Sequence, residues 1–208
     1  MITFGLTGGI ASGKSTVNKT FLAHNIPMVD ADMVARDVVA PGTYGLALIR
    51  QEFGPEYISP DGTLNRTALA KLVFSNKEAL IKINKIMEPL INTESSFQIQ
   101  KLHSQGNQIV GYDAALICEM GNADKYRPLI VVWCPRDMQI ARLMKRNQLT
   151  EPEAVARIEA QMSVETKKKM ADFTIDTSGT VEQSAAQTVQ IIEMLKLAAL
   201  QGVHNDLP

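Results

Sequence analysis

Short apolar stretches recur along the chain and alternate with longer segments of helical periodicity. The short stretches are rich in Ile, Val and Leu and have the length of buried parallel strands rather than of helices. Each is followed by polar or turn-forming residues. This pattern predicts strands at Ile2–Leu6, Ile26–Val29, Asn107–Asp113, Leu129–Cys134 and Phe173–Asp176.

The intervening segments carry signals for helices and for their ends. A helix is expected from Ser15 to Ala23, with Asn25 able to take the left-handed conformation that ends it. Two capping boxes are expected, Thr150 with Glu153 and Thr180 with Gln183. The middle of the chain predicts a run of helices, with an interruption at Pro89: Tyr44–Phe53, Arg66–Phe74, Lys77–Met87 and Leu90–His103.

The stretch between the first strand and the first helix matches the phosphate-loop pattern G-x-x-x-x-G-K-[ST] at every fixed position. In this pattern backbone N–H groups turn toward a polyphosphate, and the helix N-terminus adds a partial positive charge. Lys14 would reach the β- and γ-phosphates, and the Ser15 hydroxyl would ligate Mg²⁺. The residues expected to contact the nucleotide here are Gly8, Gly9, Ile10, Ala11, Ser12, Gly13, Lys14, Ser15 and Thr16.

Composition narrows the function further. The chain has 208 residues, 45% of them hydrophobic, which suits one domain with a sizeable core. A net charge of -1 argues against a general nucleic-acid binder. Cys118 and Cys134 lack metal-ligand spacing and suggest no disulfide framework, so a reduced cytoplasm is the simplest compartment. No targeting segment or apolar run of bilayer length is visible, so we expect no membrane partner.

A carboxylate pair follows the second strand. In an open α/β sheet ligands bind beyond the carboxyl ends of the strands, so Asp30 and Asp32 are expected near the phosphate loop. Arg36 lies four residues after Asp32 and shares its helical face. We interpret Asp32 as functional, whereas Asp30 is equally well explained as a helix cap.

Further charged residues mark the second half of the chain. An apolar run ending in Asp113 resembles the Mg²⁺-side acid of phosphate-loop proteins, although this pattern is weak alone. Arg142 and Arg146 are one helical turn apart and could stabilise a phosphoryl group from a closing flap, as could Arg157. The run Lys167–Lys169 is expected to be solvated.

Together these motifs resemble the dephospho-CoA kinase family from the first strand to the last helix. Leu6–Thr16 looks like the family's phosphate loop, and Asp30–Arg36 is similar to its D-A-D-x-x-A-R signature, the most specific match. Asp61–Arg66 with Val73-Phe74 resembles its D-G-x-L-[DN]-R segment and the [VI]-F that follows. The stretch from Arg157 to Asp172 looks like its lid and the return from it.

The resemblance implies transfer of the ATP γ-phosphate to the ribose 3′-hydroxyl of dephospho-CoA with Mg²⁺, in the cytoplasm, by a monomer or weak homo-oligomer. It implies a three-layer α/β P-loop kinase fold with a five-stranded parallel sheet. One domain, residues 1–208, would comprise a core at about 1–40, 107–135 and 171–202, a helical CoA-binding insertion at about 41–106 and a lid at about 136–170.

Site residues carry over by position. Lys14, Asp32 and Arg142 are expected to be catalytic, and Arg146 and Thr177 to join the phosphate loop in binding ATP. The expected contacts to dephospho-CoA come from six residues: Asp32, Arg36, Arg66, Glu88, Leu116 and Arg157.

Four positions depart from the family pattern. The family usually has His-Pro at Glu88-Pro89, D-x-P-L-L-x-E at Asp113–Glu119, Asn at Thr177 and often Arg-Asp at Arg146-Asn147. Glu88 places a carboxylate near an anionic substrate, and Thr177 alters the turn expected beside adenine. Two other classes stay open: a different small-molecule kinase, such as a nucleoside monophosphate kinase, and a non-catalytic nucleotide switch.

Overall fold

The computed structural model describes residues 1–202. We predict from the sequence that the tail from Gly202 is frayed, and apart from Gly202 itself this tail lies outside the described residues. Its centre is a five-stranded sheet with the strand order β2-β3-β1-β4-β5. β1 pairs in parallel with β3 and β4, and β4 pairs in parallel with β5. The strands are β1 Ile2–Gly8, β2 Met28–Asp30, β3 Ile109–Asp113, β4 Leu129–Trp133 and β5 Phe173–Asp176. All five predicted strands are therefore confirmed, and no end differs from its predicted position by more than two residues.

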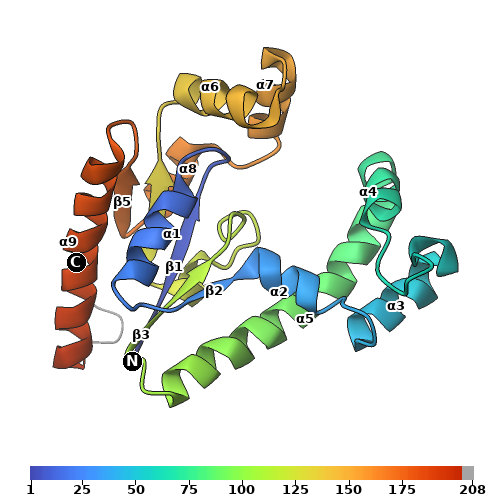
Figure 1. Cartoon of the computed structure of the whole chain (residues 1–208), viewed down its shortest axis with the longest axis horizontal. Helices are drawn as coiled ribbons and strands as arrows, with labels where there is room; N and C mark the ends of the chain where they lie inside the picture. Colours follow the sequence, from blue (N-terminus) through green and yellow to red (C-terminus); the bar gives the residue numbers. More distant parts are fainter. Residues whose placement is uncertain (203–208) are drawn as a thin grey trace. The chain divides into compact units, whose positions relative to one another are not determined.

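Helices fill the segments between the strands and follow the last one (Figure 1). Two short 3₁₀ turns, Pro55–Tyr57 and Ala123–Tyr126, add to them. The α-helices are α1 Lys14–Ala23, α2 Ala31–Asp37, α3 Tyr44–Phe53, α4 Arg66–Ser75, α5 Lys77–Ser104, α6 Arg136–Asn147, α7 Glu151–Glu159, α8 Val164–Met170 and α9 Val181–Gln201.

Alternation along the strands assigns helices to the two faces of the sheet. Phe4 and Leu6 of β1 are buried in one core cluster with Phe21 of α1 and Ile192 of α9, and Figure 1 shows α9 beside α1 and β5. Successive strand residues point to opposite faces. Accordingly Thr3 bonds to His103 near the end of α5, and Trp133 lies under Lys168 of α8. These contacts make the three layers of an α/β fold.

Local capping signals are confirmed. Asn25 has a φ of 59° just after α1, and the capping boxes of Thr150 and Thr180 are both formed. In α7 the Glu153 carboxylate accepts from Thr150, which lowers the pKa of Glu153 below its ordinary value.

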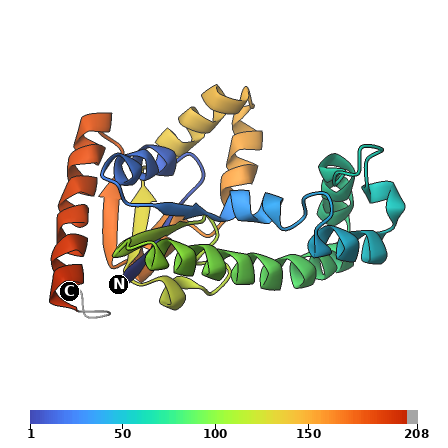
Figure 2. The same ribbon diagram turned by 60° about the horizontal axis from the view of Figure 1, so that its bottom comes forward.

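The predicted interruption at Pro89 is wrong. α5 runs as one helix from Lys77 to Ser104 with Pro89 inside it (Figure 2). Proline removes the hydrogen bond to the carbonyl four residues earlier, here that of Lys85. Both Pro89 and Lys85 are exposed, so water can satisfy the freed carbonyl and the helix continues.

The chain divides into two compact units. The core unit comprises Met1–Val29 and the residues from Ile99 onward, and the helical unit comprises Asp30–Gln98. The helical unit has its own hydrophobic cluster, centred on Val39, Ile49 and Leu69. None of the helices in residues 1–202 has both the length and the apolar character that a bilayer crossing needs.

Candidate active site

The phosphate loop, Gly8–Ser15, joins β1 to α1 as the motif requires. Gly13 sits at the N-cap of α1 with a φ of 88°, a left-handed conformation that glycine adopts without steric cost. It offers no side-chain cap, and the first turn of α1 holds no acidic residue. The helix N-terminus is therefore open to an anion. Ser15 is exposed in this first turn, where its hydroxyl is accessible to a metal ion.

Lys14 is held by the strand next to β1. Its ammonium group donates to Asp113, and the Asn18 amide donates to the other oxygen of the same carboxylate. β1 and β3 pair with Leu6 opposite Asp113, so the carboxylate lies beside the start of the loop. Asp113 is 5% exposed. The sequence raised Asp113 only as a weak signal and gave Asn18 no role, because Asp113 is distant in sequence from both Lys14 and Asn18.

A pocket of about 300 Å³ adjoins the loop. Its wall includes Gly13, Thr16 and Thr177, which the sequence assigned to ATP binding, and Arg142, which it assigned to catalysis. The residues that the sequence missed belong to the turn after β5 and the first turns of α9: Gly179, Thr180, Val181 and Ser184. A local signal could have found these four residues: their polar turn follows the end of strand β5, as the phosphate loop follows the end of β1, and ligands bind at such strand ends.

Thr177, in the turn after β5, contacts both the phosphate loop and α6. Its hydroxyl donates to the Ser12 carbonyl at 2.6 Å, and the side chain is 4% exposed. Arg142 donates to the Thr177 carbonyl at 2.7 Å and to its hydroxyl at 3.2 Å. The residue that departs from the family pattern thus ties the phosphate loop to the arginine of α6.

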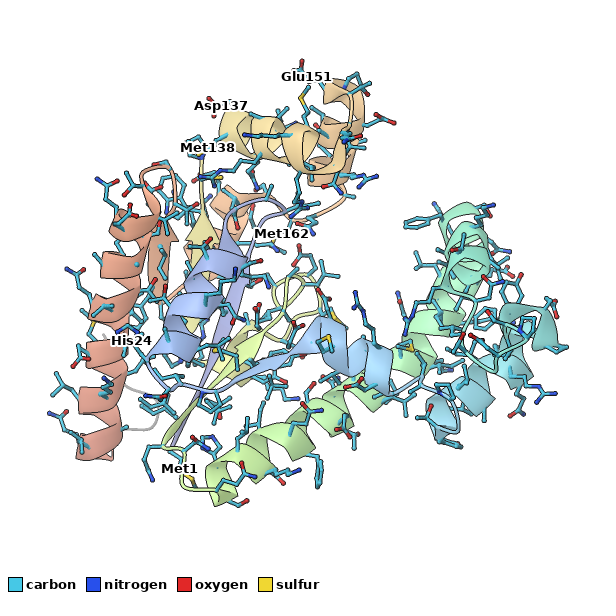
Figure 3. All side chains as sticks on the ribbon, in the orientation of Figure 1. Met1, His24, Asp137, Met138, Glu151 and Met162 are labelled. Carbon is cyan, nitrogen blue, oxygen red and sulfur yellow. The ribbon has the colours of Figure 1, made fainter. Side chains whose placement is uncertain are left out.

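The other two lid arginines to which the sequence gave a role are placed differently. Arg146 is exposed and donates from Nε to the Asn147 side chain at 2.9 Å. Arg157 is exposed on α7. Neither lines the pocket beside Gly13, so the structure brings only Arg142 to it. Figure 3 labels Asp137 and Glu151, which lie in the first turns of α6 and α7.

In the helical unit, Asp30 caps α2. Its carboxylate accepts from the N–H groups of Asp32 at 2.8 Å and Met33 at 3.2 Å, so its structural role is established. Asp32 is exposed in the first turn of α2 and Arg36 is exposed in the last. The carboxylate of Asp32 is thus accessible to a substrate.

Arg66 lies against the end of α2. Its guanidinium donates to the Arg36 carbonyl at 3.4 Å, and both side chains are exposed. The Arg66 guanidinium therefore lies near the backbone of Arg36, at the last turn of α2. Glu88 is exposed on α5, in the same unit. Leu116 belongs to the core unit and is 44% exposed in the segment after β3.

Lys167 corrects the expectation of a solvated lysine run, because its side chain is fully buried. Its ammonium donates to the Ala115 carbonyl at 2.6 Å and pairs with Glu119 at 2.8 Å. The Glu119 carboxylate also accepts from the N–H of Met162, which is labelled in Figure 3. The Lys167 ammonium group can be buried because it has an opposite charge and a hydrogen-bond acceptor beside it. Both partners lie in the segment after β3, far from Lys167 in sequence.

The two cysteines are free and buried, as expected without a disulfide framework. Burial raises the pKa of the Cys118 thiol and also that of the Cys134 thiol. Neither thiol is therefore activated as a nucleophile.

Comparison with known proteins decides the family. A family profile for dephospho-CoA kinase matches residues 2–183. The chain is 40% identical over 191 residues to the dephospho-CoA kinase of Listeria innocua, covering 92% of this chain and 96% of the relative. The chain belongs to the dephospho-CoA kinase family. It is therefore a kinase, which excludes a nucleoside monophosphate kinase as its family.

Solved structures agree. The Campylobacter jejuni dephospho-CoA kinase has a TM-score of 0.73 at 25% identity, covering 94% of this chain and 98% of that one. The Thermus thermophilus protein TT1252 has a TM-score of 0.79 at 28% identity, covering 93% and 96% respectively. The fold predicted from the dephospho-CoA kinase resemblance is confirmed.

Proposed function

We propose that this dephospho-CoA kinase family member transfers the γ-phosphate of ATP to the ribose 3′-hydroxyl of dephospho-CoA, the last step of CoA synthesis. The observation that carries the proposal is the meeting of Lys14, Asp113, Arg142 and Thr177 around one glycine loop and its pocket. Family membership supplies the acceptor.

ATP would bind with its phosphates on the loop N–H groups and Lys14, and with its nucleoside in the pocket beside Thr177. Gly13 and Thr16 line both regions. The donors fit Mg²⁺, which commonly keeps several waters and uses few protein ligands besides substrate phosphates. The exposed Ser15 hydroxyl would hold it, beside the Lys14–Asp113 pair. Bound Mg²⁺ would neutralise charge on the β- and γ-phosphates.

Asp32 would be the general base. A ribose hydroxyl must lose its proton as the new P–O bond forms, and a carboxylate within hydrogen-bond reach both accepts that proton and orients the oxygen. Asp32 is exposed and directly follows a strand end, where open α/β sheets bind ligands. Asp30 already accepts two N–H groups as a cap, which favours Asp32 for this role.

The anionic groups of dephospho-CoA would bind to Arg36 and Arg66, which lie together in the helical unit. The insertion at about 41–106 would hold this substrate, with Glu88 among its contacts, and Leu116 of the core unit would contribute an apolar contact. Arg142, with Arg146 and Arg157 as further contacts, would stabilise the transferring phosphoryl group when the lid at about 136–170 closes. We further propose a cytoplasmic enzyme that works as a monomer or weak homo-oligomer.

One coupled assay tests the activity. ADP release is measured with dephospho-CoA, with AMP and without an acceptor, with Lys14→Ala as the matched inactive control. We expect release above the no-acceptor background only with dephospho-CoA and only in the wild type. Release with AMP would favour a different acceptor, and binding of ATP with no release under any condition would favour a nucleotide switch.

A further inference from the structure

Two glutamines from the predicted lid hold one residue of the phosphate loop. The N–H of Ile10 donates to Oε1, the side-chain amide oxygen of Gln161, at 2.9 Å. The Gln139 amide donates to the Ile10 carbonyl at 2.8 Å. Both backbone groups of Ile10 are thus bonded to side chains more than a hundred residues away, and all three residues belong to the core unit.

Gln139 is built into this position. Its side chain belongs to α6 and is 4% exposed, which is unusual for a glutamine. It lies directly over the loop, since a Cβ added to Gly9 would come within 2.5 Å of its amide nitrogen. Gln161 lies in the connection between α7 and α8 and is half-buried. The loop apex therefore contacts both the first helix of the lid and its return segment.

The hydrogen bonds to Ile10 support the phosphate loop next to a residue with an unfavourable backbone conformation. Ala11 has a φ of 60°, a left-handed conformation that is sterically unfavourable for a residue with a Cβ. The carbonyl of Ile10 and the N–H of Ala11 belong to one peptide plane, and Gln139 fixes that plane. Gln161 fixes the preceding plane, between Gly9 and Ile10. The two hydrogen bonds together set the direction of the N–H groups on both sides of Ile10.

We infer that Gln139 and Gln161 are positioning residues for phosphoryl transfer: they fix the peptide groups of Ile10 and so connect the lid to the phosphate loop. The inference rests on the proposed function. The Ile10 N–H is used by Gln161, and the other N–H groups of such a loop face the phosphates, so rotating these planes would misplace donors that must match the transferring group. Neither glutamine needs to touch the reacting atoms for this effect.

The two positions have opposite hydrogen-bond roles, and this gives a crossed test. Gln161 accepts, so Gln161→Glu keeps an acceptor while Gln161→Met removes it at similar volume. Gln139 donates, so Gln139→Met removes the donor, and Gln139→Glu places a carboxylate oxygen against a carbonyl. Both Glu variants add the same charge beside Ile10, so charge alone predicts the same order at both positions.

We expect Gln161→Met to lower kcat about tenfold or more, with KM for ATP changed less than about threefold. At position 161, Glu should retain more kcat than Met; at position 139, Glu should retain less than Met. Melting temperatures of all four variants accompany the kinetics. If burial of the new charge unfolds Gln139→Glu, the half-buried 161 pair decides alone.

Two results would overturn the inference while the proposed function stands. One is a Gln161→Met enzyme with a kcat within twofold of wild type. The other is that the Glu variant has the higher kcat at both positions, or the Met variant at both. A wild type that transfers nothing to dephospho-CoA would instead overturn the proposed function itself, so the two failures are distinguishable.

Discussion

Lys14 of the phosphate loop is paired with Asp113, the last residue of the neighbouring strand β3. The lysine keeps 22% of its side chain exposed, whereas the carboxylate keeps 6%. The pair therefore holds the ammonium group at the loop, while part of the lysine side chain stays accessible. A bound polyphosphate would compete with Asp113 for this cation.

Lys14→Ala should abolish transfer to dephospho-CoA and leave the fold intact but less stable. The activity loss follows from removing the cation that would contact the β- and γ-phosphates. The stability loss, about 1–3 kcal/mol, follows from leaving a buried acceptor with one partner fewer. Assay and thermal denaturation measure both, and adding Asp113→Asn should recover stability without activity. Activity within a few-fold of wild type would contradict the assignment of Lys14.

Asp32→Asn should lower kcat by about 10²–10⁴, because the amide retains shape but cannot accept the ribose proton. ATP binding and melting temperature should change little, since Asp32 is exposed. Single-turnover measurements separate the chemical step from product release. Asp30→Asn is the matched control: asparagine caps helices as well as aspartate does, so kcat should stay near that of the wild type. A kcat above about a tenth of wild type for Asp32→Asn would exclude it as the base.

Arg142→Ala should lower kcat far more than it weakens ATP binding to the open enzyme, because closing of the lid would bring the guanidinium to the phosphoryl group. Arg142→Lys should restore little, since lysine lacks the planar fork whose two nitrogens bond to the hydroxyl and the carbonyl of Thr177. Arg146→Ala is the control on the same helix, with a smaller effect expected. Equal losses in ATP affinity and kcat for Arg142→Ala would indicate ground-state binding instead.

Cys118 and Cys134 should resist alkylation in the native protein. Burial raises the pKa of both thiols. At a pH near or below the ordinary pKa of a thiol, a smaller fraction of each is therefore the reactive thiolate than in a solvent-exposed cysteine. Iodoacetamide labelling at pH 8, read by mass spectrometry, should modify both only after denaturation. Rapid native labelling of either cysteine would show that its pocket opens to solvent.

Where structure follows from neighbours in sequence, the sequence predicted it well. The caps of Thr150 and Thr180 and the left-handed Asn25 depend on residues within one helical turn, and all are confirmed. The phosphate loop and its flanking strand and helix are likewise local. Family resemblance added the sheet and its covering helices.

What the sequence did not predict depends on partners distant in the chain. Lys167 looked like part of a solvated run, but Ala115 and Glu119 surround its ammonium group. Gln139 showed no signal, because its partner is the backbone of Ile10, and backbone groups are identical in every sequence. Pro89 was misread because the outcome of a helical proline depends on whether the freed carbonyl is exposed.

The strand pairing has a consequence for how the chain is made. β1 pairs with residues 109–113 and 129–132, so the strand that precedes the phosphate loop cannot complete its ladders until residue 132 has left the ribosome. The helical unit has a hydrophobic cluster of its own and is one continuous stretch, Asp30–Gln98, so it can condense earlier. Nascent chains of intermediate length should therefore expose Phe4 and Leu6, two residues that the finished protein buries completely.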